Sequence, residues 1–332
     1  MTEHSTAPPP PGAMRKAIVK ILFLIFFAVL VPSPILSVLG YGPAASFIGL
    51  AGVGAAIAVL TAGIRMALLA TVIAAVFAAL LTFASVTWWT AALVMAVVAF
   101  VFGLTALKGW QSGFVALAIT LSFIASDGAQ AVDPLATAAV VLGIGFLVWG
   151  AIVAGIARLL FHKPVLPAHS ETRRTVIGYV SMLVVVTFVT QSLAIGLNLG
   201  HVGGWLVMTP FLVILPHIRD GFTRSLRRAA GTVVGFVVII GLSELTTSHT
   251  ILSAVGAVMF TVAIYAKFRR WNYFLYAVFL TGGIVILEGL STSVTTVAEY
   301  RLGATLGAVA ISLAAMAITT LVGRKLPAQQ SG

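Results

Sequence analysis

Residues 203–235 read GGWLVMTPFLVILPHIRDGFTRSLRRAAGTVVG, and this stretch contains the pattern that decides the fold. An apolar run ends at Pro216, a gap with four arginines follows, and a second apolar run begins near Gly231. The four arginines are Arg219, Arg224, Arg227 and Arg228. Apolar runs of about 20 residues span a bilayer as helices, and cationic loops resist translocation. The stretch therefore predicts two membrane helices joined by a short cytoplasmic loop.

Basic residues recur in every second gap between the apolar runs of the chain. They lie at Arg15/Lys16/Lys20, Arg65, Lys108, Arg158/Lys163/Arg173/Arg174, Arg219/Arg224/Arg227/Arg228, Lys267/Arg269/Arg270 and Arg324/Lys325. The intervening gaps carry the acids Asp127, Asp133, Glu244, Glu288 and Glu299. Such alternation predicts a chain that crosses the membrane an even number of times, with both termini in the cytoplasm. Arg301 alone breaks the pattern.

The composition excludes a soluble domain. Hydrophobic residues make up 60% of the chain and charged residues 8%, whereas soluble domains carry about a quarter charged residues. The net charge of +11 lies in short cytoplasmic gaps, so it indicates topology and contact with membrane lipids, and we expect no nucleic acid partner. The chain has no cysteine and none of the common enzyme or nucleotide-binding motifs, so we expect no enzyme, cofactor or metal.

Apolar runs of spanning length predict an all-α integral membrane protein with about twelve transmembrane helices. The expected spans are 18–39, 43–62, 66–84, 88–107, 111–128, 134–160, 175–198, 202–218, 229–246, 250–266, 271–289 and 299–322. A count of ten or eleven, with re-entrant segments, is the alternative. The first run resembles a signal peptide, but it continues to Leu39, which favours an uncleaved helix.

The two halves of the chain share a pattern at an offset of 161 residues. Lys108-Gly109-Trp110 matches Arg269-Arg270-Trp271, Thr120 matches Thr281, and Asp127 matches Glu288. Each half holds six helices, an even number, so we expect two parallel repeats related by an axis along the membrane normal. The expected organisation is a disordered cytoplasmic tail (1–14), a first repeat (15–160), a basic loop (161–174), a second repeat (175–323) and a cytoplasmic tail (324–332).

Three segments of the second half resemble one family of membrane proteins. They are residues 203–235 quoted above, RRWNYFLYAVFLTGG (269–283) and AEYRLGATLGAVA (298–310). In this order they resemble the fusaric-acid-resistance-like (FUSC) family, which is distantly similar to plant aluminium-activated malate transporters. The resemblance implies a bacterial membrane protein that exports aromatic acids. Many members also carry a large cytoplasmic helical region, whereas this chain has only the short loop 161–174.

Three charged residues are candidates for transport chemistry. Arg301 lies near the outer start of the last helix, where a guanidinium group could bind a carboxylate substrate between the two repeats. The alternative is a structural ion pair with Glu299 or Glu288, or contact with the outer surface. Asp127 and Glu288 occupy matching places and could carry a proton for coupled transport, or could be exposed acids of outer loops.

Prolines and glycines give weaker signals. Pro210 and Pro216 interrupt the eighth span, and a broken helix can expose backbone groups to a ligand or can simply kink. The GxxxG pairs Gly231/Gly235 and Gly303/Gly307 predict close helix packing.

These features together predict a multi-pass inner-membrane transporter that exports small organic acids, aromatic ones among them, with proton coupling. A passive organic-anion channel and a non-transporting membrane scaffold are the alternatives. The expected partners are membrane lipids and a small organic anion, and a homo-oligomer is left open.

Overall fold

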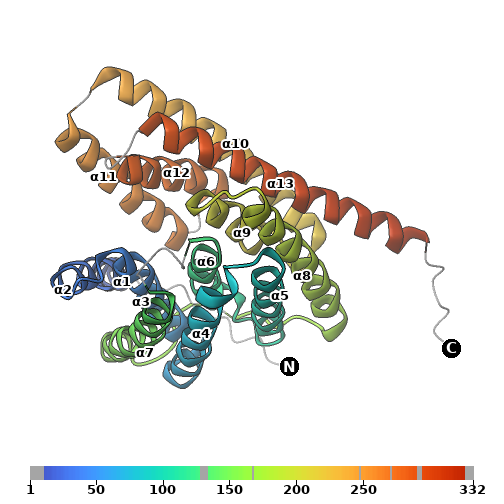
Figure 1. Cartoon of the computed structure of the whole chain (residues 1–332), viewed down its shortest axis with the longest axis horizontal. Coiled ribbons are helices and arrows are strands. Elements are labelled where there is room, and N and C mark those ends of the chain that lie inside the picture. Colours follow the sequence, from blue (N-terminus) through green and yellow to red (C-terminus); the bar gives the residue numbers. More distant parts are fainter. Residues whose placement is uncertain are drawn as a thin grey trace.

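The computed structural model describes residues 11–325 except for 128–133, 167, 247, 270 and 290–293; side chains are also left undescribed at 11–15, 268, 287–289 and 322–325. The described residues form helices and connecting segments without a strand (Figure 1). The α-helices are α1 (Pro11–Leu30), α2 (Pro32–Val38), α3 (Ala45–Ala62), α4 (Ile64–Ala84), α5 (Trp88–Leu104), α6 (Gln111–Asp127), α7 (Leu135–Leu160), α8 (Arg173–Gly196), α9 (His201–Val213), α10 (Ile218–Leu245), α11 (His249–Phe268), α12 (Tyr273–Gly289) and α13 (Val294–Lys325). Two 3-10 turns, η1 (Gly42–Ala44) and η2 (Thr105–Lys108), precede α3 and α6.

The prediction of an all-α protein with twelve apolar helical segments is confirmed. Within the described residues, nine segments are long and apolar enough to span a membrane, and α6, α9 and α12 supply three shorter apolar ones. The first expected span is divided into α1 and α2, because Pro32 lacks the N–H that would continue α1 and instead starts a new helix. The last span starts earlier than expected, so Arg301 lies about two turns inside α13.

Lipid-facing helices surround a buried interior. Large apolar side chains are exposed along α4, where they include Leu69, Val72, Val76 and Leu80. By contrast, residues 203–213 of α9 are all buried, and α9 packs against α6, α8, α10 and α13. Its 13 residues span only about 20 Å, less than the roughly 30 Å of a hydrocarbon core, which an enclosed helix tolerates because it has no lipid boundary to match.

The basic gaps gather at one end of the helices. Hydrogen bonds and one ion pair connect them: Lys20 Nζ to Leu160 O (3.3 Å), Val165 N to Leu60 O (2.8 Å), Glu171 N to Ala106 O (3.1 Å) and His217 Nδ1 to Glu171 Oε1 (3.7 Å). At an intervening acidic gap, Asp127 Oδ2 instead lies 3.5 Å from Nδ1 of His201. These contacts place the basic gaps from Lys20 to Arg219 at one end of the helices, and the side of the membrane on which that end lies stays a prediction.

The helix bounds fit the expected offset between the halves. Adding 161 to the bounds of α5 (88–104) gives 249–265, and α11 covers 249–268; adding it to α6 (111–127) gives 272–288, and α12 covers 273–289. The packing pairs α3–α7, α4–α7 and α4–α6 also correspond to α9–α13, α10–α13 and α10–α12. These correspondences support the two repeats, and the symmetry axis along the membrane normal stays a prediction.

One GxxxG pair behaves as predicted and the other does not. A Cβ atom on Gly231 would lie 2.7 Å from Cβ of Ala277 and 2.8 Å from the carbonyl oxygen of Phe274, so α10 and α12 touch backbone to backbone there. Gly303 is exposed, and a Cβ atom on it would meet nothing within 4 Å. The expectation of close packing at Gly303 was wrong because this residue points away from the helices that enclose α13.

These two glycines give a matched stability test. We expect Gly231→Ala to lower the free energy of unfolding by about 1–3 kcal/mol, because the methyl group would push α10 away from α12. Gly303→Ala should leave stability unchanged or raise it by about 1 kcal/mol, because alanine favours the helix. Equal unfolding transitions for the two variants in detergent would contradict the close approach of α10 and α12.

The absence of cysteine allows a clean topology test. Single cysteines introduced at Ser170 and at Val86, which are exposed in gaps of opposite type, should react with a membrane-impermeant maleimide from opposite sides. Lys16→Cys should react from the same side as Ser170→Cys. Labelling of Val86→Cys and Ser170→Cys from the same side would break the predicted topology.

Candidate functional site

Arg228 on α10 is a fully buried arginine without a hydrogen-bond partner. Its exposed fraction is 0%, and Nε, Nη1 and Nη2 find no acceptor in the part of the chain that the structure describes. No described carboxylate lies within ion-pair distance of it either. Arginine stays charged in a protein, and an uncompensated charge in the interior costs several kcal/mol. The charge of Arg228 could therefore be compensated by an anion that binds beside it.

Further polar side chains are buried with Arg228 on one face of α10. Gly221, Ser225, Arg228, Thr232, Gly235 and Ile239 recur every three or four residues and are all buried. The hydroxyl groups of Ser225 and Thr232 have no hydrogen-bond partner among the described residues. Helical spacing places these side chains on a single stripe. This stripe faces α12 and α13, against which α10 packs.

Helix α12 brings two tyrosines to the same interior. The guanidinium carbon of Arg224 lies 4.4 Å from the centroid of the Tyr273 ring. Tyr276, one turn later, lies within electrostatic reach of Arg224, Arg228 and Arg301. The close contact of Gly231 and Gly235 with α12 sets this arrangement, because it lets α10 approach without an intervening side chain.

Arg301, on α13, is a second buried arginine. It is 1% exposed, and its guanidinium carbon lies 3.6 Å from the centroid of the Trp205 ring on α9. Such a cation–π contact holds the planar guanidinium group flat against the indole. The other side of Trp205 packs edge-to-face on Phe123 of α6, with 4.9 Å between ring centroids. Arg301 is therefore fixed in orientation by an aromatic pair.

Helices α9 and α12 are held apart at this site. In the first half the corresponding helices α3 and α6 pack directly on each other, whereas α9 and α12 do not make a comparable contact within the described residues. Arg301 touches Trp205 of α9 and lies within electrostatic reach of Tyr276 of α12. Long polar side chains thus occupy the space that small residues close in the first half.

We name the arginines Arg224, Arg228 and Arg301 with Tyr273, Tyr276 and Trp205 the cationic cluster. Guanidinium groups donate two parallel hydrogen bonds to a carboxylate, and hydroxyl groups can complete its coordination. Aromatic rings beside such groups suit a flat or apolar body attached to the anion. The cluster is therefore chemically equipped to bind an organic anion.

Arg301 lies elsewhere than the sequence predicts. We expected it near the outer start of its helix and between the two repeats. Instead, the main contacts of α13 among the described residues are with α8, α9, α10 and α12, all in the second half, and Arg301 contacts Trp205, which packs on Phe123 of the first half. The reason is the early start of α13 at Val294, which carries Arg301 into the helix bundle.

Of the two predicted acids, the structure places the side chain of Asp127 alone, and Asp127 lies outside the cationic cluster. Asp127 ends α6 and pairs with His201 at the start of α9, one helical turn beyond Phe123. Glu288 lies in the last turn of α12, and its side chain is outside the described residues. Along the helix axis it is twelve residues, about 18 Å, from Tyr276. Neither acid is brought to Arg228 by the described fold.

Of the two prolines, one lies inside a helix and the other lies in the non-helical segment between α9 and α10. Pro210 lies inside α9 and is buried, and the helix continues through it to Val213. Pro216 follows in segment 214–217, which packs against Gly221 at the start of α10. The expected interruption therefore lies only at Pro216, where the residue before a proline is disfavoured in a helix.

Sequence reasoning missed Arg228 as a site residue. We grouped it with Arg219, Arg224 and Arg227 because all four share a gap of basic charge. A signal was present: Ser225, Arg228, Thr232 and Gly235 lie at helical spacing on one stripe, while Arg227 faces out. The charge pattern alone cannot separate two adjacent arginines, but the helical period can.

The comparisons with known proteins support one family. Residues 184–315 match the sequence model of the family described as fusaric acid resistance protein-like, a range that holds all six residues of the cationic cluster. No curated protein and no solved structure shows significant similarity to the chain.

Proposed function

Because residues 184–315 carry the fusaric acid resistance protein-like region, we propose that this multi-pass membrane protein exports small organic acids from the cytoplasm. The observation that carries the proposal is the fully buried guanidinium group of Arg228, which has no hydrogen-bond partner among the described residues. A carboxylate substrate would supply the missing charge at the moment it binds. The site is then most stable when occupied, which is what a selective carrier needs.

The shape of the cluster favours acids with an aromatic or otherwise apolar body. Trp205 and Tyr273 each present a ring to a guanidinium group, and Tyr276 lies beside the same charges. A flat ring attached to the carboxylate could pack among these side chains while the arginines hold its charge. Inorganic anions would use the charge but leave the aromatic contacts empty, so they should bind less tightly.

A coupled carrier fits this site better than an open channel. A wide anion pore needs a continuous polar or basic lining. Along α9, however, residues 203–213 are all buried, and the only polar groups among their side chains are the hydroxyl of Thr209 and the indole N–H of Trp205. We therefore infer alternating access to the cationic cluster, with a proton gradient as the driving force. Saturable flux would support this reading, and flux linear in concentration would favour the channel.

The proposed location is the cytoplasmic (inner) membrane of a bacterium, with the basic gaps on the cytoplasmic side. With that orientation Arg224 and Arg228 lie toward the cytoplasmic end of α10, from which an exported acid would enter. The basic gaps around it would concentrate anions near the entrance.

A neighbouring pair of arginines gives a matched test of the binding site. Arg228→Gln should weaken uptake of radiolabelled benzoate into proteoliposomes by about ten-fold or more, because a charge-assisted contact contributes about 1.5–3 kcal/mol. Arg227→Gln, at an exposed position, should transport as the native chain does. Transport of the neutral analogue benzamide should change little in either variant.

The thermal unfolding midpoint of each variant serves as the control for correct folding. Removing a buried charge should not lower the midpoint of Arg228→Gln, so a loss of benzoate transport reflects the site and not misfolding. Equal benzoate affinity in Arg228→Gln and the native chain would show that Arg228 binds no substrate.

Asp127 is the proposed proton carrier at the acidic end. It is partly buried and paired with His201, so a proton can be exchanged between the two side chains. We expect Asp127→Asn to abolish the stimulation of benzoate flux by a pH gradient while exchange without a gradient continues. Glu244→Gln, an exposed acid, is the control. If a pH gradient still stimulates benzoate flux fully in Asp127→Asn, the proton is carried by another residue.

A further inference from the structure

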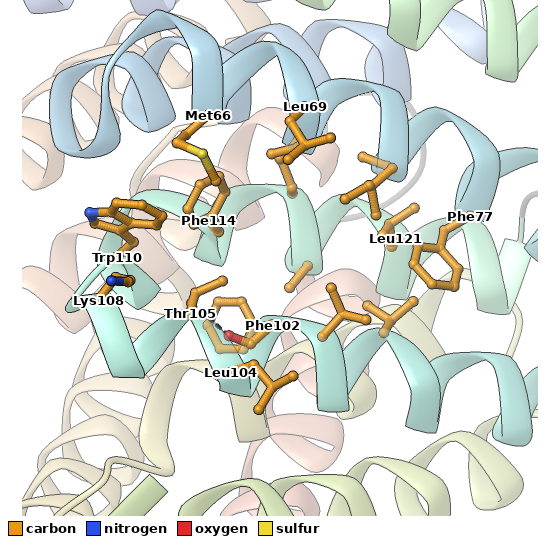
Figure 2. A pocket seen from close by; sticks show the side chains of 17 residues that line it. Met66, Leu69, Phe77, Phe102, Leu104, Thr105, Lys108, Trp110, Phe114 and Leu121 are labelled. Carbon is orange, nitrogen blue, oxygen red and sulfur yellow. Dashed lines mark hydrogen bonds between the residues drawn. The ribbon is translucent and has the colours of Figure 1, made fainter. Parts of the chain in front are cut away.

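An apolar crevice of about 310 Å3 lies between α4, α5 and α6 (Figure 2), in the half of the chain that contributes no residue to the cationic cluster. Its wall is almost entirely aliphatic and aromatic, with Met66, Leu69, Ala70, Phe77, Phe102, Phe114 and Leu121 among the lining residues. No part of the proposed transport chemistry uses these residues. The crevice is therefore a candidate binding site for a different molecule.

The polar groups of the crevice are confined to one end. Lys108 is the charged residue of its lining, and Figure 2 shows Lys108 and Trp110 at the opposite end from Phe77 and Leu121. The hydroxyl group of Thr105 donates to the carbonyl oxygen of Phe102 at 2.6 Å, so it is already satisfied. No described carboxylate pairs with Lys108. The occupant should accordingly be a long apolar group with an anionic head.

The charged end lies at the membrane surface on the side of the basic gaps. The backbone N–H of Glu171, in the basic loop, donates to the carbonyl oxygen of Ala106, two residues before Lys108. From Trp110 to Leu121 the crevice follows α6 for eleven residues, or about 16 Å, which is half of a hydrocarbon core. The depth of the crevice thus equals one leaflet.

The crevice is open toward the surrounding bilayer. Leu69 on α4 and Leu104 on α5 line it and are 50% and 39% exposed, on faces that other lipid-exposed leucines and valines share. A lipid chain can therefore enter sideways without passing through water. Tryptophan at the charged end fits this reading, because indole rings prefer the headgroup level of a membrane.

We propose that this crevice binds one acyl chain of an anionic phospholipid, with the headgroup phosphate at Lys108. A small aromatic acid fits less well, because with its carboxylate at Lys108 it would leave most of the roughly 16 Å of apolar wall unfilled. The bound chain fills the space between α4, α5 and α6 and so stabilises the packing of the first half. This inference does not rest on the proposed transport function.

The test is native mass spectrometry of the full chain, extracted from nanodiscs of phosphatidylglycerol and phosphatidylcholine. We expect one phosphatidylglycerol retained per chain. Lys108→Gln should reduce the preference for phosphatidylglycerol by about five-fold, in line with one cation near an anionic surface. Ala70→Phe, which fills the crevice, should lose the retained lipid.

Two controls separate this site from general effects. Lys16→Gln removes an exposed charge on the same side of the membrane and should keep the preference. Val72→Phe adds the same ring to an exposed face of α4 outside the crevice and should keep the lipid. The proposal fails if Lys108→Gln and Lys16→Gln behave alike, if Ala70→Phe retains the lipid while remaining monodisperse, or if a small organic acid is retained in place of the lipid.

Discussion

The burial of permanently charged guanidinium groups constrains the second half of the molecule more than any other interaction. Arg228 and Arg301 are the two largest fully buried side chains of the described structure. Their desolvation is costly; an indole ring at 3.6 Å faces Arg301, whereas Arg228 has no hydrogen-bond partner among the described residues. Helices α9 and α12 consequently stand apart, and a polar interior exists inside a membrane protein.

The two halves differ in the residues that they bury at corresponding positions of the predicted repeat. At the 161-residue offset, Arg228 corresponds to Ala67 (228 − 161 = 67), and both residues are 0% exposed. The small residue lets the first-half helices close on each other, and the crevice that remains between α4, α5 and α6 is apolar. At the position that corresponds to Ala67, the second half carries the buried charge of Arg228.

Close helix contacts position the cationic cluster, and they come from glycines rather than from the charged residues themselves. Gly231 and Gly235 bring α10 to the backbone of α12, on which Tyr273 contacts Arg224. Gly303 has the same motif and makes no such contact, because it is on the exposed face of α13. A GxxxG motif thus permits close packing but does not choose the face that packs.

The sequence by itself determined the membrane fold, the twelve helical segments, the sorting of basic and acidic gaps, and the family resemblance of the second half. These properties follow from apolar runs of spanning length and from charge in short loops, which act locally and leave a readable pattern. Only the tertiary structure separated Arg228 from its neighbour Arg227, put Trp205 under Arg301 and paired Asp127 with His201. Those relations join helices far apart in the chain, and they depend on which face of each helix is buried, a property that packing decides.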